Sequence, residues 1–458
     1  MTARASLRAL ARRRQEVSAP IVGRPYAVFA GHHRKAPRTV AFRLKLPALS
    51  DNVFSLLVLR FPLPRGLGMN ADTTTRAPTS SRVGMSDAPP STPNVASYAP
   101  ASVEAFAKPT AVRFAVLGDA FLDISVGPLD SVPAPGADVE VDAVAQHPGG
   151  SALNTAWHLA AQGVDTSLYA AVGRDRAAKT LMDALRLESK ITEPSKSIAT
   201  LNYQPTATCV ALHGTGMDRT FISAPGAAKT ATLNQLLPEG VDALDVTHVH
   251  IGGFYACPGV HSGLVTLVQK LRQRDVKVSM DPNFDPLGEW RSPAMKNVLR
   301  GAAAVDLFMP SEVEACEITG RDSAEEALEA LVGDDRSTSD APVALAVIKR
   351  GANGVLAGDS SGRRWSAPAC TVSRVVDTNG AGDAFNAGFL RVWAQGGEVG
   401  EALRVGCASA AIAAQHSGAV GAWAPTSLSV DAQAEAEYGE KQWWQKGILA
   451  CMAPRKLA

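Results

Sequence analysis

Short runs of apolar, often β-branched residues alternate with longer stretches of helical periodicity from about residue 112 onward. Such runs are typical of strands buried on both faces of a parallel sheet, and a periodicity of about 3.6 residues indicates amphipathic helices. The pattern predicts strands at 113–118, 167–172, 247–251, 277–280, 306–309 and 343–348, and helices at 152–162, 259–274, 324–332, 384–395 and 400–416. This order predicts an α/β fold with one doubly wound, mainly parallel sheet flanked by helices, in a domain spanning residues 111–428.

Two segments depart from this order because their apolar and polar residues alternate one by one. They lie near residues 138–147 and 208–223, and glycines at 214 and 216 interrupt the second as they would in a hairpin. We expect these segments to form a small β lid over the edge of the main sheet.

The ends of the chain differ in composition from this domain. Residues 1–50 carry eleven Lys or Arg and one acidic residue, Glu16, as mitochondrial and chloroplast transit peptides do. Residues 1–68 are therefore interpreted as a basic leader, either a transit peptide or sequence upstream of a start at Met69 or Met85, which places the protein in an organelle or in the cytoplasm. Residues 69–110, rich in Ser, Thr and Pro, predict a disordered linker, and residues 429–458 a C-terminal tail.

Charge and cysteine spacing exclude several classes of function. The net charge is +1, and since residues 1–50 contribute +10, the remaining 408 residues carry −9, which argues against a nucleic-acid-binding surface. No stretch approaches the roughly 18 apolar residues of a membrane span, so no membrane partner is expected. The six cysteines are widely spaced, which indicates free thiols rather than a zinc cluster or a disulfide framework; they are Cys209, Cys257, Cys316, Cys370, Cys407 and Cys451.

The strongest chemical signal is the stretch DTNGAGDAF at residues 377–385, between a predicted strand at 372–376 and a predicted helix. Gly380 and Gly382 allow their N–H groups and that of Ala381 to converge in front of the helix, whose N-terminus adds donors and partial positive charge. The turn therefore predicts an anion hole for a phosphate. Asp383, in the first helical turn, would accept the proton of an attacking hydroxyl. A capped helix start without a ligand is the alternative.

Two motifs together resemble the ribokinase-like, PfkB-type carbohydrate kinase family. The stretch at 377–385 is similar to the family's C-terminal signature DTxGAGDxF, and PGGSALNTA at residues 148–156 looks like its N-terminal signature. The resemblance covers about residues 112–428. It implies a ribokinase-like fold with a lid, ATP and Mg²⁺ as cofactors, a sugar as the second substrate, and homodimers paired through the lid.

Further positions match the family's site residue by residue. For acceptor binding the resemblance implies Asp123, Gly149, Gly150, Asn154 and Asn283, the last in the run MDPNFDP at 280–286. For nucleotide binding it implies Lys349, Gly351, Gly354 and Ser311. Glu314 is implied to hold magnesium through water, although Ser311 stands where the family's NxxE element has Asn. Asp377 is implied to bind a monovalent cation, K⁺, together with residues 417–421.

Three functions stay open at this point. The first is ATP-dependent phosphorylation of a sugar hydroxyl, the second is an adenosine or other nucleoside kinase, and the third is a non-catalytic organellar regulatory protein similar to fructokinases. The complete set of residues at 380–383 favours an enzyme. The segment at 149–154 has no aromatic residue to stack on a base, which favours a sugar, and the sequence does not specify which sugar.

Overall fold

The structure, a computed structural model, describes residues 112–214, 217–333 and 342–421. The predicted basic leader, linker and C-terminal tail lie outside these residues, as does the predicted end of the domain beyond residue 421. These parts of the domain division therefore stay predictions.

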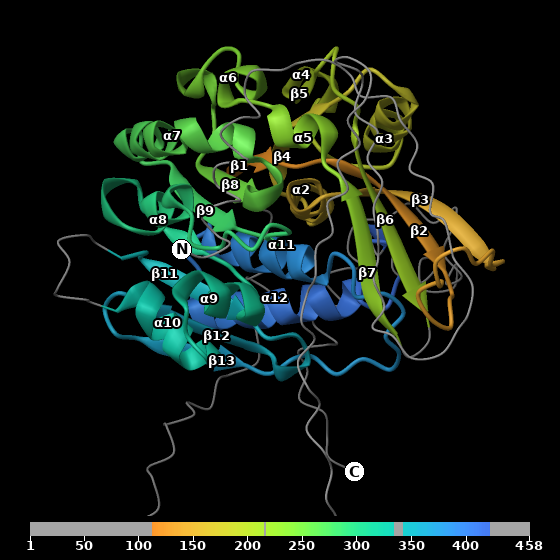
Figure 1. Cartoon of the computed structure of the whole chain (residues 1–458). Helices are drawn as coiled ribbons and strands as arrows, with labels where there is room; N and C mark the ends of the chain where they lie inside the picture. Colours follow the sequence, from red (N-terminus) through yellow and green to blue (C-terminus); the bar gives the residue numbers. More distant parts are fainter. Residues whose placement is uncertain (1–111, 215–216, 334–341, 422–458) are drawn as a thin grey trace, which may run out of the picture. The chain divides into compact units, whose positions relative to one another are not determined.

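One large sheet forms the centre of the described domain (Figure 1), with the strand order β13-β12-β11-β10-β9-β8-β1-β4-β5. Its strands are β1 Arg113–Gly118, β4 Asp165–Val172, β5 Ile198–Thr200, β8 His248–Gly252, β9 Lys277–Asp281, β10 Leu307–Phe308, β11 Leu345–Lys349, β12 Val355–Asp359 and β13 Arg364–Ala367. All neighbouring pairs are parallel except β11 with β12 and β12 with β13, at one edge. The predicted doubly wound, mainly parallel sheet is confirmed.

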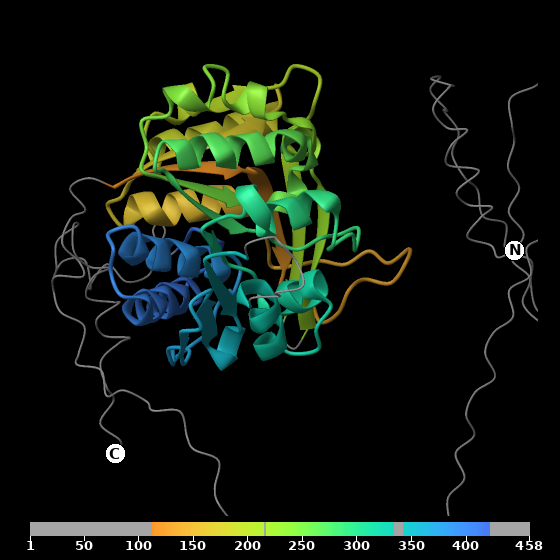
Figure 2. The same ribbon diagram turned by 90° about the vertical axis from the view of Figure 1, so that its left-hand side faces the viewer.

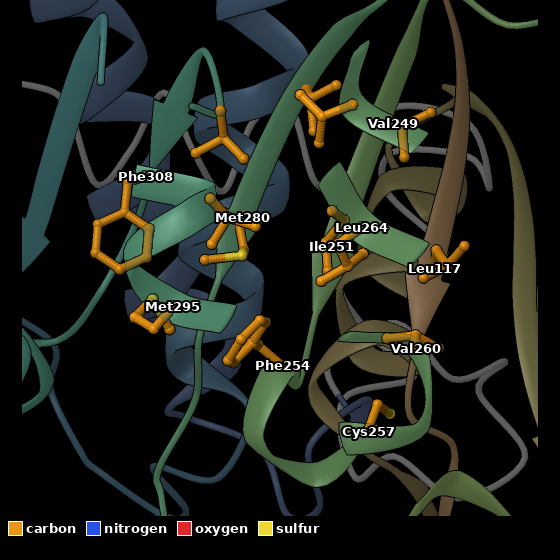
Figure 3. Close-up of a cluster of buried hydrophobic side chains, with 14 of the residues drawn as sticks. Leu117, Val249, Ile251, Phe254, Cys257, Val260, Leu264, Met280, Met295 and Phe308 are labelled. Carbon is orange, nitrogen blue, oxygen red and sulfur yellow. The ribbon is translucent and has the colours of Figure 1, made fainter. Parts of the chain in front are cut away.

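Helices cover both faces of this sheet (Figure 2). They are α2 Ser151–Ala161, α3 Arg176–Leu187, α4 Pro194–Ser197, α5 Gly226–Thr230, α6 Leu233–Leu236, α7 His261–Gln273, α8 Pro293–Leu299, α9 Glu312–Thr319, α10 Ala324–Val332, α11 Ala381–Trp393 and α12 Val399–Ala413. One apolar core packs α2, α3, α11 and α12 against the sheet, and a second packs α5 to α10 against its other face. Figure 3 shows part of the second core, where side chains of β1, β8, β9 and β10 gather with those of α7 and α8.

A second, four-stranded sheet forms the lid, in the order β3-β2-β6-β7. Its strands are β2 Phe121–Gly127, β3 Ala143–Gly149, β6 Ala207–Gly214 and β7 Met217–Ala224, and they lie side by side at one flank of the domain in Figure 1. The segment predicted near 208–223 is the β6–β7 pair. The segment predicted near 138–147 begins its strand only at Ala143, and β2 was not predicted as a strand.

The strand predicted at 372–376 is wrong. The segment has no regular secondary structure, and its valines Val375 and Val376 are 59% and 43% exposed. Valine favours strands only where a pleated, half-buried surface receives it, and here no neighbouring strand does so within the described residues. The helix that follows begins at Ala381, three residues before the predicted start.

No two cysteines in the described part of the chain form a disulfide with each other. Cys209, Cys257 and Cys407 are buried, and Cys316 and Cys370 are half-buried. Cys451 lies outside the described residues. Among the helices of the described ranges, none combines the length and the apolar character that a membrane crossing requires.

Candidate active site

The mouth of α11 is shaped by Gly380. Its φ of +74° belongs to the left-handed region, and a Cβ there would lie 2.6 Å from the carbonyl oxygen of Ala419, so only glycine fits without strain. Within the described residues no side chain caps the helix at this position. The N–H of Ala381 donates to the carbonyl of Thr378 at 3.3 Å, so this one of the three expected donors is engaged within the turn. Gly382 is exposed at the helix start.

Asp383 lies in the first turn of α11, and α2 holds both oxygens of its carboxyl group. Ser151 Oγ donates to Oδ1 and Asn154 Nδ2 donates to Oδ2, each at 2.9 Å. Burial, assisted by the charge of Asp281, raises the pKa of Asp383 to about 8, although the bond from Asn154 acts in the opposite direction. A carboxyl group tuned to this range is suited to accept a proton near neutral pH.

The glycine pair before α2 leaves space for the side chain of Asp123 and for the backbone of Asp119. A Cβ on Gly149 would lie 2.2 Å from Cγ of Asp123, so a larger residue there would displace this carboxyl group. Gly150 has a φ of +99° and packs against the backbone of Asp119. The side chain of Asp119 in turn accepts the N–H of Ala152 at 2.8 Å, which fixes the start of α2.

Asp123 lies on the lid strand β2 and reaches the turn before α11. Asn379 Nδ2 approaches Asp123 Oδ2 at 3.5 Å. Burial raises the pKa of Asp123 to about 7. Both side chains line a pocket between the lid and the segments before α11 and after α12, and its lining residues are Asp123, Ser125, His147, Ala211, His213, Arg219, Asp377, Asn379, Gly418 and Ala419.

Asp377 joins the lid to this turn. Its Oδ1 pairs with Arg219 Nη2 of β7 at 2.5 Å and accepts the N–H of Asn379 at 2.7 Å. Its Oδ2 accepts the N–H of Gly418 at 3.0 Å. The structure therefore brings Asp377 next to the predicted 417–421 segment, with a guanidinium as its partner.

The turn after β11 contains two glycines with positive φ. Gly351 has a φ of +54° and open space around its Cα, whereas Gly354 has a φ of +82° and a Cβ there would lie 2.2 Å from the carbonyl oxygen of Ala367. Arg350 pairs outward with the carboxylates of Glu312 and Glu325 at 3.5 and 3.3 Å. Its charge is thereby directed to α9 and α10.

Lys349, expected at the nucleotide, turns inward. Its Nζ donates to Asp281 Oδ2 at 2.5 Å and to Asn386 Oδ1 at 3.2 Å. Asn386 Nδ2 donates to the same oxygen of Asp281. The side chains of Lys349, Asp281 and Asn386 thus hydrogen-bond to one another near the start of α11.

The segment 311–314 forms a capping box at the start of α9. Ser311 Oγ accepts the N–H of Glu314 at 3.4 Å, and Glu314 Oε2 accepts the N–H of Ser311 at 2.8 Å. Burial, together with the charge of Asp281, raises the pKa of Glu314 to about 7. Serine at this position thus serves the helix as an N-cap.

Of the acceptor residues expected from the sequence, only Asp123 lines the pocket; Asn283 lies outside its lining, as do Asn154, the glycine pair and Asp383. Asn283 adopts a φ of +57°, its N–H donates to Asp281 Oδ1 at 3.1 Å, and its Oδ1 accepts the N–H of Phe284. The structure therefore gives it the role of a turn residue after β9, the local alternative for this motif.

Several site residues have no signal of their own in the sequence. Ser151 and Asn379 lie inside the two motifs and could be found by asking which polar neighbours reach a carboxylate. His147, Arg219 and Asn386 are brought to the site by the lid and by α11. His250, in contrast, is a buried packing residue whose Nδ1 contacts Ser279 Oγ at 2.9 Å.

The chain is similar to several known proteins. A family model described as pfkB family carbohydrate kinase matches residues 113–426. A cytidine kinase of Thermococcus kodakarensis is 27% identical over 262 residues, 57% of this chain and 84% of that protein. A ribokinase of Haemophilus influenzae is 25% identical over 271 residues, 59% of this chain and 82% of that protein. The structure of Arabidopsis thaliana ribokinase complexed with ribose and ATP superposes with a TM-score of 0.60 at 20% identity, covering 76% of this chain and all of the other.

Proposed function

Since the chain belongs to the pfkB family of carbohydrate kinases, which transfer a phosphoryl group to an alcohol, we propose that it transfers the terminal phosphoryl group of ATP to a hydroxyl group of a sugar, with Asp383 as the base. The observation that carries this proposal is the placement of Asp383. Its carboxyl group stands in the first turn of α11 and is oriented by Ser151 and Asn154 from the helix that follows the glycine pair.

The protein contributes little covalent chemistry to the proposed reaction. The acceptor oxygen forms a bond to the terminal phosphorus while the bond from that phosphorus to the bridging oxygen of ADP breaks. The proton of the hydroxyl passes to Asp383. Gly380, Ala381 and Gly382 at the helix start would stabilise the negative charge on the phosphoryl group in transfer, because positioning and charge stabilisation supply most of the catalysis in such reactions.

The lining of the pocket favours a sugar over a nucleoside as the acceptor. Apart from alanine and glycine it is polar, with carboxylate, amide, hydroxyl, imidazole and guanidinium groups and no Phe, Tyr or Trp to stack on a base. We assign hydroxyl recognition to Asp123 and Asn154, and the acceptor-side glycines Gly149 and Gly150 leave the space that the side chain of Asp123 and the backbone of Asp119 occupy. Asn154 Oδ1 is buried without a hydrogen-bond partner, so it is available to a hydroxyl donor. Asn283 would act on the pocket only through the turn at Asp281.

For the nucleotide, we propose that the turn between Gly351 and Gly354 approaches the phosphates, with Ser311 nearby. Oxygen donors such as Glu314 fit magnesium, which prefers oxygen ligands and keeps several waters. Among the described residues no three His, Cys, Asp or Glu side chains gather to enclose a metal ion, so Glu314 would hold magnesium through water. Bound with the phosphates, the ion supplies neutralising charge.

Two further assignments are part of this proposal. K⁺ would have to share Asp377 with Arg219, so its effect on the rate should be small; comparing rates in potassium and sodium salts tests this. A homodimer through the lid is supported by exposed apolar side chains on its outer strands, Val144, Phe221 and Ile222, at 64, 52 and 61% exposure. Sedimentation of the wild type and of Phe221→Asp tests the dimer.

The compartment follows from the start of translation. We propose import into an organelle if residues 1–68 are translated, and a cytoplasmic protein if translation begins at Met69 or Met85. The N-terminal sequence of the native protein distinguishes the two.

The proposal is tested with a panel of sugars, sugar acids and nucleosides, measuring ADP and the phosphorylated product together. Rapid product formation with a sugar supports it. Faster turnover with adenosine or cytidine would replace the sugar by a nucleoside, and consumption of ATP with none of the acceptors would contradict a kinase.

A further inference from the structure

A buried ion pair lies directly behind the anion hole. Lys349 is the last residue of β11 and Asp281 the last residue of β9, so both side chains start from the same edge of the parallel sheet. The side chains of Lys349 and Asp281 are only 13% and 5% exposed. Asn386, fully buried one turn along α11 from Asp383, bonds to both.

The ammonium group is close to the glycine of the helix mouth. A Cβ built on Gly382 would lie 3.6 Å from Lys349 Nζ, within van der Waals contact distance. The positive charge of Lys349 therefore stands next to the backbone that would receive the phosphoryl group. Because Gly382 has no side chain, only a short distance separates its backbone from the ammonium group of Lys349.

The charged groups around this pair come from several elements. Burial lowers the pKa of Lys349. Three nearby carboxylates more than offset this and raise the pKa; they belong to Asp281 of β9, Glu314 of α9 and Asp383 of α11. The negative charge of Asp281 raises the pKa of Asp383, and the positive charge of Lys349 lowers it. His250 of β8 also faces the pair.

Burying an ion pair costs desolvation free energy, and apolar residues of similar volume often stabilise a fold as well or better. The pair is therefore better explained by what its charges do to the adjoining site. Resting on the proposed function, we propose that Lys349 is a positioning residue for phosphoryl transfer: held by Asp281 and Asn386, its ammonium provides a fixed positive charge behind Gly382 and offsets the charge of Asp281 on Asp383.

The first test separates this role from a structural one. The single variant Lys349→Met leaves Asp281 buried without a counter-charge and should be destabilised. The double variant Lys349→Met with Asp281→Asn removes both charges and should recover most of the melting temperature. If the charge behind Gly382 matters, the double variant still loses about 10²-fold in kcat, the order of magnitude for removing one stabilising group at a developing charge. Its KM for the acceptor should stay nearly constant. A stable double variant with wild-type kcat would overturn the inference.

The matched control is the ion pair between Lys277 and Asp306, which joins Nζ and Oδ1 at 3.5 Å at the start of β9. It belongs to the same strand but lies at the opposite edge of the sheet. The double variant Lys277→Met with Asp306→Asn should keep the wild-type kcat. An equal loss of kcat in both double variants would also overturn the inference, because the effect would then not depend on the anion hole.

The second test does not need turnover. The ¹³C resonance of the Asp383 carboxyl group is titrated in protein without substrates. Asp281→Asn should lower the pKa of Asp383, and adding Lys349→Met to that variant should raise it again. Unchanged values would overturn the inference even in an active kinase. If the wild type phosphorylates no acceptor, the proposed function fails, while opposite shifts would still support the coupling of Lys349 to Asp383.

Discussion

Asn154 donates a hydrogen bond from Nδ2 to Oδ2 of Asp383 at 2.9 Å, and the two residues are 229 positions apart in the sequence. The bond joins the two motifs of the chain, because Asn154 belongs to the helix after the glycine pair and Asp383 to the helix after the anion hole. It also favours the ionised form of this carboxyl group, whereas burial raises its pKa. In the proposed mechanism, this one amide links acceptor binding to the strength of the base.

We predict that Asn154→Ala raises the pKa of Asp383 further and lowers kcat/KM at pH 7. A hydrogen bond to a charged group contributes about 1.5–3 kcal/mol, so the midpoint of the pH profile should move up by about one to two units. The measurement is kcat/KM between pH 6 and pH 10. Asn202→Ala, which removes an exposed amide that contacts Arg174, is the control and should leave the profile unchanged. An unshifted profile in Asn154→Ala would separate this amide from the base.

We predict that Gly149→Ala raises KM for the acceptor and leaves KM for ATP nearly unchanged. The added Cβ would meet Cγ of Asp123 at 2.2 Å and force the carboxylate away from its position. Loss of one well-placed hydrogen bond costs about 1–3 kcal/mol, which is roughly a 5- to 150-fold change. Steady-state kinetics with each substrate varied in turn measures it.

The control for that variant is Gly263→Ala on α7. There the added Cβ meets Cδ1 of Leu233 at 2.5 Å, in a part of the fold remote from the pocket lining. It should lower the melting temperature without changing either KM. If Gly149→Ala behaved in the same way, Asp123 would have no role in acceptor binding.

The pH dependence of stability follows from the same carboxyl group. Folding raises the pKa of Asp383 from 3.8 to about 8, so the folded state binds the extra proton between these values. The free energy of unfolding contributed by Asp383 therefore falls as pH rises from about 4 to 8. Asp383→Asn should be more stable than the wild type, by a margin that grows across this window. Chemical denaturation at pH 5 and pH 8.5 measures the margin, and a margin that shrinks as pH rises would contradict the assigned shift.

The ion pair between Arg219 and Asp377 connects the lid to the turn before α11, and both side chains are mostly buried, at 22% and 18% exposure. We predict that Arg219→Ala raises KM for the acceptor several-fold, because the lid loses its contact with the body. Arg113→Ala removes the exposed ion pair with Asp245 and is the control, since exposed pairs contribute little. A larger effect on KM for ATP than on KM for the acceptor would assign Arg219 to the nucleotide instead.

The sequence predicts the fold well where hydrophobic runs are long and buried. The strand predicted at 113–118 is β1 residue for residue, and the helix predicted at 324–332 is α10. The three-residue β5 and the edge strand β13, in which Arg364 and Ser366 are polar and exposed, lack such a run. The valines at 372–376 carry strand propensity without a strand partner, which is why that prediction fails.

The candidate site likewise contains some residues that the sequence predicts and others that it does not. Within each of the two motifs the residues are close in sequence, so the motifs alone indicate Asp383, Asn154 and Gly149. Arg219 and Asn386 come to the site from a lid strand and from the buried face of α11, and no local pattern marks them. The inward direction of Lys349 likewise depends on where β9 ends, which only the assembled sheet decides.

The most direct test of the account is turnover by Asp383→Asn with the best acceptor of the panel. The variant keeps the size of the side chain but cannot accept the proton, so kcat should fall by about 10²- to 10⁴-fold, the usual contribution of a positioned acid or base. ATP binding, measured by calorimetry, should be retained. Turnover within a few-fold of the wild type would contradict the assignment of Asp383 as the base.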